Sequence, residues 1–194
     1  MSDLVYRRHS AGGIASTASY SPCGTFRHAL TRCWAPGLPR LVFVLLNPST
    51  ATEAADDPTI ARCVRRARDG GFGAVRIVNL FAFRATRPAD LRRAADPVGP
   101  GADAAIAGAA RWADLIVCGW GNHGALLGRG PAVAAALRRA GHRLHHLSLT
   151  RTGHPMHPLY RPLAEGPRPW HPQATRGGQP GTSWTEDAGT PAAP

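Results

Sequence analysis

The chain has 194 residues, of which 43% are hydrophobic, and a formal net charge of +11. This length is enough for one domain with a sizeable core, and no apolar run approaches the length of a membrane span. The first residues lack the apolar stretch of a secretory signal, so we expect a cytoplasmic protein with no membrane partner. All 23 strongly basic residues are arginine, which fits biased coding as well as phosphate neutralisation. The charge therefore leaves a nucleic acid or nucleotide partner open, and the oligomeric state is not predicted.

The four cysteines are Cys23, Cys33, Cys63 and Cys118, and no two have C-x-x-C spacing. A structural zinc site needs closely paired ligands, and a disulfide framework is not expected in a cytoplasmic chain of this size. Neither a P-loop nor a G-x-G-x-x-G sequence between a strand and a helix is present. We therefore expect free or buried thiols, no metal and no cofactor.

The first forty residues predict an irregular, β-rich lead-in, with short strands at 4–9 and 24–34 separated by a Gly/Ser/Ala-rich link. Residues 41–46 are six apolar residues that end at a turn signal, a pattern typical of a strand buried on both faces. Apolar residues at helical spacing then predict a helix over 58–69. Pro58 suits its first turn and Asp57 its N-cap.

The second half continues with a strand at 74–80, an Ala-rich helix at 102–112, a strand at 114–119, a helix at 131–140 and a strand at 143–149. Strands that alternate with helices favour a three-layer α/β/α sandwich with a mainly parallel central sheet. From residue 165 onward Pro, Gly, Thr and Ala dominate without periodicity. We therefore predict one domain over 1–164 and a disordered tail over 165–194.

Every predicted core strand ends in polar or small residues, and in open α/β sheets ligands bind beyond the carboxyl ends of the strands. If the strands are parallel neighbours, their end loops meet at one edge of the sheet. These loops hold Asn47-Pro48-Ser49-Thr50, Asn79, Gly119-Trp120-Gly121-Asn122 and Thr152 to Pro158. We expect them to form one pocket.

Five motifs occur in a fixed order along the chain. They are Asn47-Pro48-Ser49-Thr50-Ala51, Asp56-Asp57-Pro58-Thr59-Ile60, Asn79 to Thr86, Trp120-Gly121 and His157-Pro158-Leu159-Tyr160. In these motifs, over about residues 6–161, the chain closely resembles the bacterial and archaeal family of unknown function DUF1643. One departure is Ala102, where members usually have Asn before the residue matching Asp103. The family name implies no activity.

More distantly, the layout resembles the uracil-DNA glycosylase superfamily, an α/β/α sandwich with a four-stranded parallel sheet. The loop at Asn47 is similar to the one whose amide or carboxylate positions the attacking water, but it lacks both glycines. Asn79 occupies a place comparable to the Asn that reads the flipped base. His157 is similar to the His that stabilises the departing base, although the Ser of that motif is missing.

This resemblance implies hydrolysis of an N-glycosidic bond, in which a positioned water attacks while donors neutralise the base. Asn47 and His157 would be the catalytic residues of this reaction. We add Asp57, a candidate base that the resemblance does not supply, as a third catalytic residue. The aromatic side chains of Phe81 and Trp120 would stack on a base, and Arg84 would contact a phosphate or carboxylate. Substrate contacts would come from Pro48, Ser49, Thr50, Asn79, Phe81, Arg84 and Trp120.

Each of these residues also has a structural interpretation. Asn47 before Pro48 is a good turn former, and Ser49, Thr50, Asp56 and Asp57 could cap the following elements. Asn79 could satisfy backbone groups, Trp120 could belong to the core, His157 could lie on the surface, and Arg62, Arg65 and Arg66 could form a solvated helix face.

Two other functions remain open. The first is a nucleic-acid- or nucleotide-binding module without catalysis, which is favoured because the loop at Asn47 holds no carboxylate. A different small-molecule reaction with Asp56 or Asp57 as the base is the other.

Overall fold

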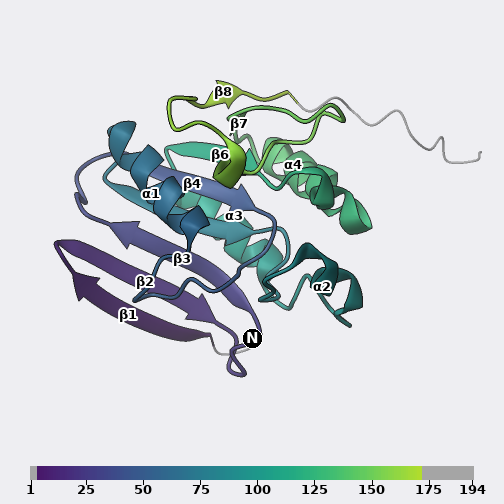
Figure 1. Cartoon of the computed structure of the whole chain (residues 1–194), viewed down its shortest axis with the longest axis horizontal. Coiled ribbons are helices and arrows are strands. Elements are labelled where there is room, and N and C mark those ends of the chain that lie inside the picture. The colour runs from purple at the N-terminus through teal and green to yellow at the C-terminus, as the bar shows by residue number, and fades with distance from the viewer. Residues whose placement is uncertain (1–3, 172–194) are drawn as a thin grey trace, which may run out of the picture.

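The structure is a computed structural model that describes residues 4–171. Its sheet has eight strands in the order β1-β2-β3-β5-β4-β6-β7-β8 (Figure 1). The strands are β1 Val5–Ala11, β2 Ile14–Tyr20, β3 Arg27–Cys33, β4 Arg40–Leu45, β5 Ala74–Asn79, β6 Leu115–Gly119, β7 Leu144–His146 and β8 Arg168–Pro169. The helices are α1 Pro58–Asp69, α2 Pro88–Arg93, α3 Ala102–Trp112 and α4 Arg129–Arg139, with 3-10 turns η1 Asn122–Gly128 and η2 Pro158–Tyr160.

The sheet is mixed, so the expectation of a mainly parallel sheet is wrong. Strands β5, β4, β6 and β7 run parallel to one another. Antiparallel pairings join β1 to β2, β2 to β3, β3 to β5 and β7 to β8. The error arises at β2, because its sequence Ile-Ala-Ser-Thr-Ala-Ser-Tyr predicts a link and not a strand. Its small and hydroxyl side chains carry a weak apolar signal, yet the strand pairs along its whole length with β1.

Helices cover both faces of the parallel strands, as the three-layer prediction requires (Figure 1). Side chains alternate between the two faces of a strand, and β4 shows this directly. Its residues Leu41, Phe43 and Leu45 pack in a core with Ile60, Cys63 and Ala67 of α1. Val42 and Val44 pack on the opposite face in a core that includes residues of α3 and α4. The buried run of β4 is therefore the centre of an α/β/α sandwich.

The register of the parallel strands brings their carboxyl ends to one edge. Leu45 at the end of β4 pairs with Asn79 of β5 and with Gly119 of β6. The segments that begin at Leu46 and Trp120 consequently leave the sheet side by side. This edge is where a ligand site is expected in an open α/β sheet.

The last described residues pack against the domain. Arg168–Pro169 pair with β7, and Trp170 is only 7% exposed. Its ring contacts that of Trp120 edge-on, with ring centroids 5.5 Å apart. The predicted disordered tail starts at residue 165, so its first residues include this strand and core contact. The remainder of that prediction, residues 172–194, lies outside the described residues. Of the helices in the described part, none has the length and apolar character needed to cross a membrane.

Candidate functional site

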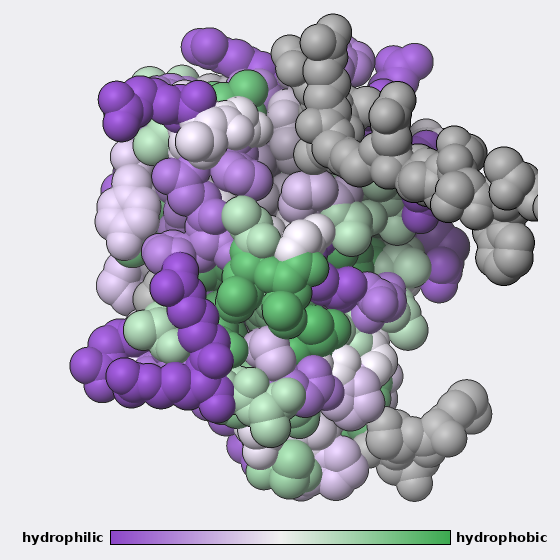
Figure 2. Space-filling model, turned by 90° about the vertical axis from the view of Figure 1, so that its right-hand side faces the viewer, coloured by the Kyte–Doolittle hydropathy of each residue, from purple (hydrophilic) through white to green (hydrophobic). Residues whose placement is uncertain are grey.

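A pocket of about 530 Å³ opens at the carboxyl edge of the parallel strands. The parallel strands of Figure 1 point toward the face shown in Figure 2, where apolar side chains gather at the centre among hydrophilic ones. Six of the sequence-predicted residues line this pocket: Asn47, Ser49, Thr50, Asp57, Trp120 and His157. They come from four separate segments of the chain. Three of these are the loops after β4, β6 and β7, which the strand-end argument predicted to converge, and the fourth, at Asp57, was not part of that argument.

The side chain of Asn47 is held in one orientation. Its Nδ2 donates to the backbone oxygen of Ala85 at 2.7 Å and to that of Pro48 at 2.9 Å. Because both partners are carbonyl oxygens, the amide nitrogen must face them, and Oδ1 is left as an acceptor. Asn47 thus ties the loop after β4 to the loop after β5, and it keeps an oxygen that can accept from a water or a ligand N–H.

His157 is a neutral hydrogen-bond donor. Its Nδ1 accepts from the backbone N–H of Leu159 at 3.4 Å and caps η2. Burial lowers the pKa of His157 to about 4, and the nearby carboxylate of Asp57 offsets this only in part. A neutral imidazole that accepts through Nδ1 carries its proton on Nε2. At neutral pH the second ring nitrogen can therefore donate to a ligand without a charge.

Asp57 caps the N-terminus of α1 and also lines the pocket. Its Oδ1 accepts from the backbone N–H of Ile60 at 2.9 Å, which confirms the predicted N-cap of α1. Its neighbours Pro58 and Thr59 line the pocket with it. The carboxylate therefore sits at the positive end of the α1 dipole and at the pocket wall, where a water can meet its second oxygen.

Two buried arginines of β3 hold the loop that precedes Asp57, and sequence reasoning missed both. Arg32 pairs with Asp56 at 2.6 Å and donates to the backbone oxygen of Thr52 at 2.6 Å. Arg27, only 2% exposed, donates to the backbone oxygen of Ala51 at 2.6 Å. Two charged residues in a buried strand are rare unless they are paired, so the sequence of β3 did carry a signal.

Four predicted substrate contacts lie outside the pocket lining. Pro48 uses its backbone oxygen to accept from Asn47 and from the N–H of Ala85. Asn79 and Phe81 are 5% and 0% exposed and do not reach the pocket wall. Arg84 donates to the backbone oxygen of Gly24 and lies over the ring of Tyr20 at 5.6 Å. It points to the antiparallel side of the molecule, so no phosphate clamp forms in this pocket.

Trp120 contributes to the pocket floor, but most of its ring is core. It is 2% exposed, and Trp170 packs edge-on against it. Gly124 and Gly130 leave space for the indole, because a Cβ at either position would lie 2.0 Å or 2.8 Å from ring atoms. A ring enclosed in this way cannot offer a free face to a base, and the expected stacking role is not supported by its placement.

The loops after β6 and β7 supply further polar groups, of which Asn122 belongs to a predicted strand-end loop but had no predicted role, and Thr150 was not predicted. Asn122 and Thr150 line the pocket, together with apolar walls from Met156 and Leu159. Thr152 Oγ1 donates to Asn122 Oδ1 at 2.8 Å. Because its oxygen is engaged, the amide nitrogen of Asn122 is the end available to a ligand. Within residues 4–171, no three His, Cys, Asp or Glu side chains gather closely enough to hold a metal ion.

The fold and the pocket define an α/β protein with a polar site, which includes one carboxylate, at the end of its parallel strands. The chain belongs to the family DUF1643, described as a protein of unknown function, which matches residues 27–159. This agrees with the five ordered motifs. No curated protein and no solved structure matches the chain significantly.

Proposed function

We propose that the pocket hydrolyses the N-glycosidic bond of a nucleoside or nucleotide, with the glycosylase-like arrangement that the sequence resemblance implies. The observation that carries this proposal is that Asn47, Asp57 and His157 line one pocket. They supply an acceptor for water, a carboxylate and a neutral donor. The four parallel strands β5-β4-β6-β7, with helices on both faces, support the distant resemblance.

In the proposed reaction, the bond between the anomeric carbon and the base nitrogen breaks, and the base takes the electron pair. Water forms the new bond to the carbon and gives its proton to the carboxylate of Asp57. Asn47 Oδ1 orients that water, and the Nε2–H of His157 hydrogen-bonds the base as negative charge develops. A neutral donor suits this step, because it stabilises the developing anion without first pairing tightly with a neutral substrate.

The lining favours a nucleoside over a polyphosphate. The volume of about 530 Å³ lies within the usual range of small-molecule sites, and Leu46, Ala85, Met156 and Leu159 provide apolar walls. None of the lining residues, all of them in the described part of the chain, is an arginine. A phosphate group would therefore remain outside the pocket, and the heterocycle and sugar would make the contacts.

A binding module without catalysis is the second candidate. It is favoured by the internal hydrogen bonds of the site, because Asn47 Nδ2 and Asp57 Oδ1 both hold backbone groups of the chain itself. In this alternative the same pocket retains a nucleoside, and no bond breaks.

Base release measured by mass spectrometry over a panel of nucleosides and nucleoside monophosphates separates the two candidates. The informative variant is Asp57→Ser, because serine preserves the N-cap while removing the carboxylate. We expect the wild type to release a free base and Asp57→Ser to be slower by about a hundredfold or more, with an unchanged unfolding midpoint. Asp69→Asn, at the exposed far end of α1, is the matched control.

Each remaining outcome has a clear meaning. Binding of a nucleoside by calorimetry without base release would select the binding module. Base release by Asp57→Ser at the wild-type rate would remove Asp57 from the mechanism. A folded protein that neither binds nor cleaves any member of the panel would refute both candidates.

A further inference from the structure

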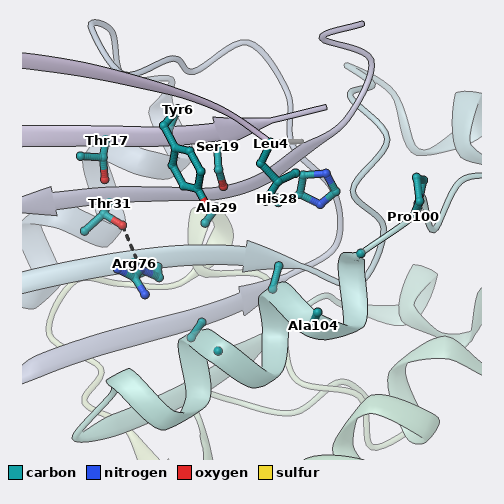
Figure 3. A pocket seen from close by; sticks show the side chains of 15 residues that line it. Leu4, Tyr6, Thr17, Ser19, His28, Ala29, Thr31, Arg76, Pro100 and Ala104 are labelled. Carbon is teal, nitrogen blue, oxygen red and sulfur yellow. Dashed lines mark hydrogen bonds between the residues drawn. The ribbon is translucent and has the colours of Figure 1, made fainter. Parts of the chain in front are cut away.

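A second cavity, of about 750 Å³, lies on the opposite side of the fold from α1, where β1, β2 and β3 extend beside α3 (Figure 3). It shares no lining residue with the pocket at the strand ends. The strand register explains its floor, because directly paired residues point to the same face. Thr17 pairs with Thr31, and Thr31 pairs with Arg76, so two hydroxyls and a guanidinium form one row.

Arg76 is fixed in place and has no acidic partner at this cavity. Its Nε donates to Thr31 Oγ1 at 3.0 Å, and its guanidinium lies over the ring of Trp112 at 4.1 Å. None of the residues that line the cavity, all within residues 4–171, is Asp or Glu. Burial lowers the pKa of Arg76, and the charged side chain of Arg40 adds to this effect. The Trp112 ring and the Thr31 hydroxyl hold the guanidinium of Arg76 in place, and its terminal nitrogens remain available to donate to a ligand. Such a group is preorganised to bind an anion.

His28 provides an independent sign of a missing ligand. It lines the cavity and is only 3% exposed, yet its Nδ1 is buried without a hydrogen-bond partner in the described part of the chain. Burial lowers the pKa of His28, so the ring is neutral at pH 7. A buried polar atom of this kind is costly unless something pairs with it. A polar atom of a bound molecule would remove that cost.

The wall opposite the sheet is built for close approach. Ala104, Ala105, Gly108 and Ala109 of α3 face the cavity, so no long side chain fills it. At the start of α3, Gly101 occupies the N-cap in the left-handed region with φ 81° and no side-chain cap. A Cβ added to Gly101 would lie 3.9 Å from Cε1 of the His28 ring. This end of the cavity therefore also carries the positive end of a helix dipole.

We propose that this cavity binds an organic anion about the size of two fused rings, with a carboxylate or phosphate monoester on Arg76 and a polar atom on His28. Thr31 lies three positions beyond His28 along β3, which corresponds to about 10 Å. A flat apolar body spans this distance between the small side chains of α3 and the sheet. In Figure 3, Arg76 and His28 lie toward opposite ends of the labelled side chains, with Ser19 and Ala29 between them.

Calorimetry on the full chain tests this site with three related probes, each with a ring hydroxyl for His28: 5-hydroxy-1-naphthoate, 5-hydroxy-1-naphthyl phosphate and the neutral 5-hydroxynaphthalene-1-methanol. We expect at least one anion to bind tenfold or more tightly than the neutral alcohol, since a charge-assisted pair contributes about that much. The better of the two anions distinguishes a carboxylate site from a phosphate site. If neither anion binds more tightly than the alcohol, the proposal is wrong.

Two variants with matched controls locate the binding. Arg76→Gln is expected to reduce the affinity for the anion about tenfold or more. The control is Arg68→Gln, which removes a guanidinium of α1 that is stacked on the ring of Trp34 and should leave the affinity for the anion unchanged. Ala104→Leu fills the cavity and is expected to weaken all three probes, whereas Ala107→Leu, on the same helix but facing a different groove, is not. Unchanged anion affinity in either Arg76→Gln or Ala104→Leu, with the fold intact, would overturn the assignment.

Discussion

The protonation state of His157 controls both the acid stability of the protein and the proposed donor. An unperturbed imidazole titrates near 6.5, and burial in the folded protein lowers the pKa of His157 to about 4. Between these values the unfolded chain binds a proton that the folded chain does not. The free energy of unfolding therefore decreases as the pH falls from about 6.5 to about 4, and this group adds no pH dependence above 6.5.

The size of the effect follows from the shift. Each pH unit within this window removes about 1.4 kcal/mol, so lowering the pH from 7.0 to 4.5 costs about 2–3 kcal/mol through His157 alone. His157→Gln lacks the titrating group. Its loss of unfolding free energy between pH 7.0 and pH 4.5 should therefore be about 2–3 kcal/mol smaller than that of the wild type. His123→Gln, at an exposed histidine of the same pocket, is the control and should behave like the wild type.

Urea unfolding at pH 7.0 and pH 4.5 measures this difference for the three proteins. NMR of the His157 ring in the folded protein measures the midpoint directly, which we expect at about pH 4. Equal losses of stability in the wild type and His157→Gln, or a ring that titrates near 6.5, would show that His157 is solvated and would remove the argument for a neutral donor.

Three further outcomes follow from other parts of the fold. Arg32→Leu should cost about 2–3 kcal/mol in urea unfolding and expose the loop over 51–56 to proteases, because it leaves a carboxylate and a carbonyl unpaired. Gly124→Ala should lower stability by about 2 kcal/mol, since its Cβ would lie 2.0 Å from Trp120, whereas Gly37→Ala meets nothing within 4 Å and should be neutral. Hydrogen bonds with neighbouring hydroxyls lower the pKa of Cys23 to about 7, so its alkylation rate should reach half its maximum near that pH; a midpoint near 9 would contradict those contacts.

The parts of the fold that could be predicted are those where burial imposes a period. Residues 41–46 are apolar because β4 is covered on both faces, and Ile60, Cys63 and Ala67 repeat at helical spacing because α1 buries one side. The predicted strand at 4–9 corresponds to β1, but its hairpin partner β2 escaped prediction for the converse reason. Most residues of β2 are small or carry a hydroxyl, so no apolar period marks it as a strand.

The location of the candidate site could be predicted from the sequence, but the orientation of several of its side chains could not. The position of Asn47 followed from the end of a buried strand, and His157 from an ordered motif. The direction of a side chain beyond a strand end does not follow from spacing, which is why Arg84 was expected at the wrong place. Arg32 was missed because its function depends on Asp56, a residue 24 positions away whose proximity only the tertiary fold creates.

A complex of the protein with a free nucleobase and ribose, the products of the proposed reaction, tests the central claim most directly. We predict that the base lies in the pocket at the strand ends, with one of its nitrogen or oxygen atoms within hydrogen-bond distance of His157 Nε2. The anomeric carbon of the sugar should then face Asn47 Oδ1 and the carboxylate of Asp57. Products bound at another place, or in this pocket with the anomeric carbon turned away from both side chains, would contradict the proposed function.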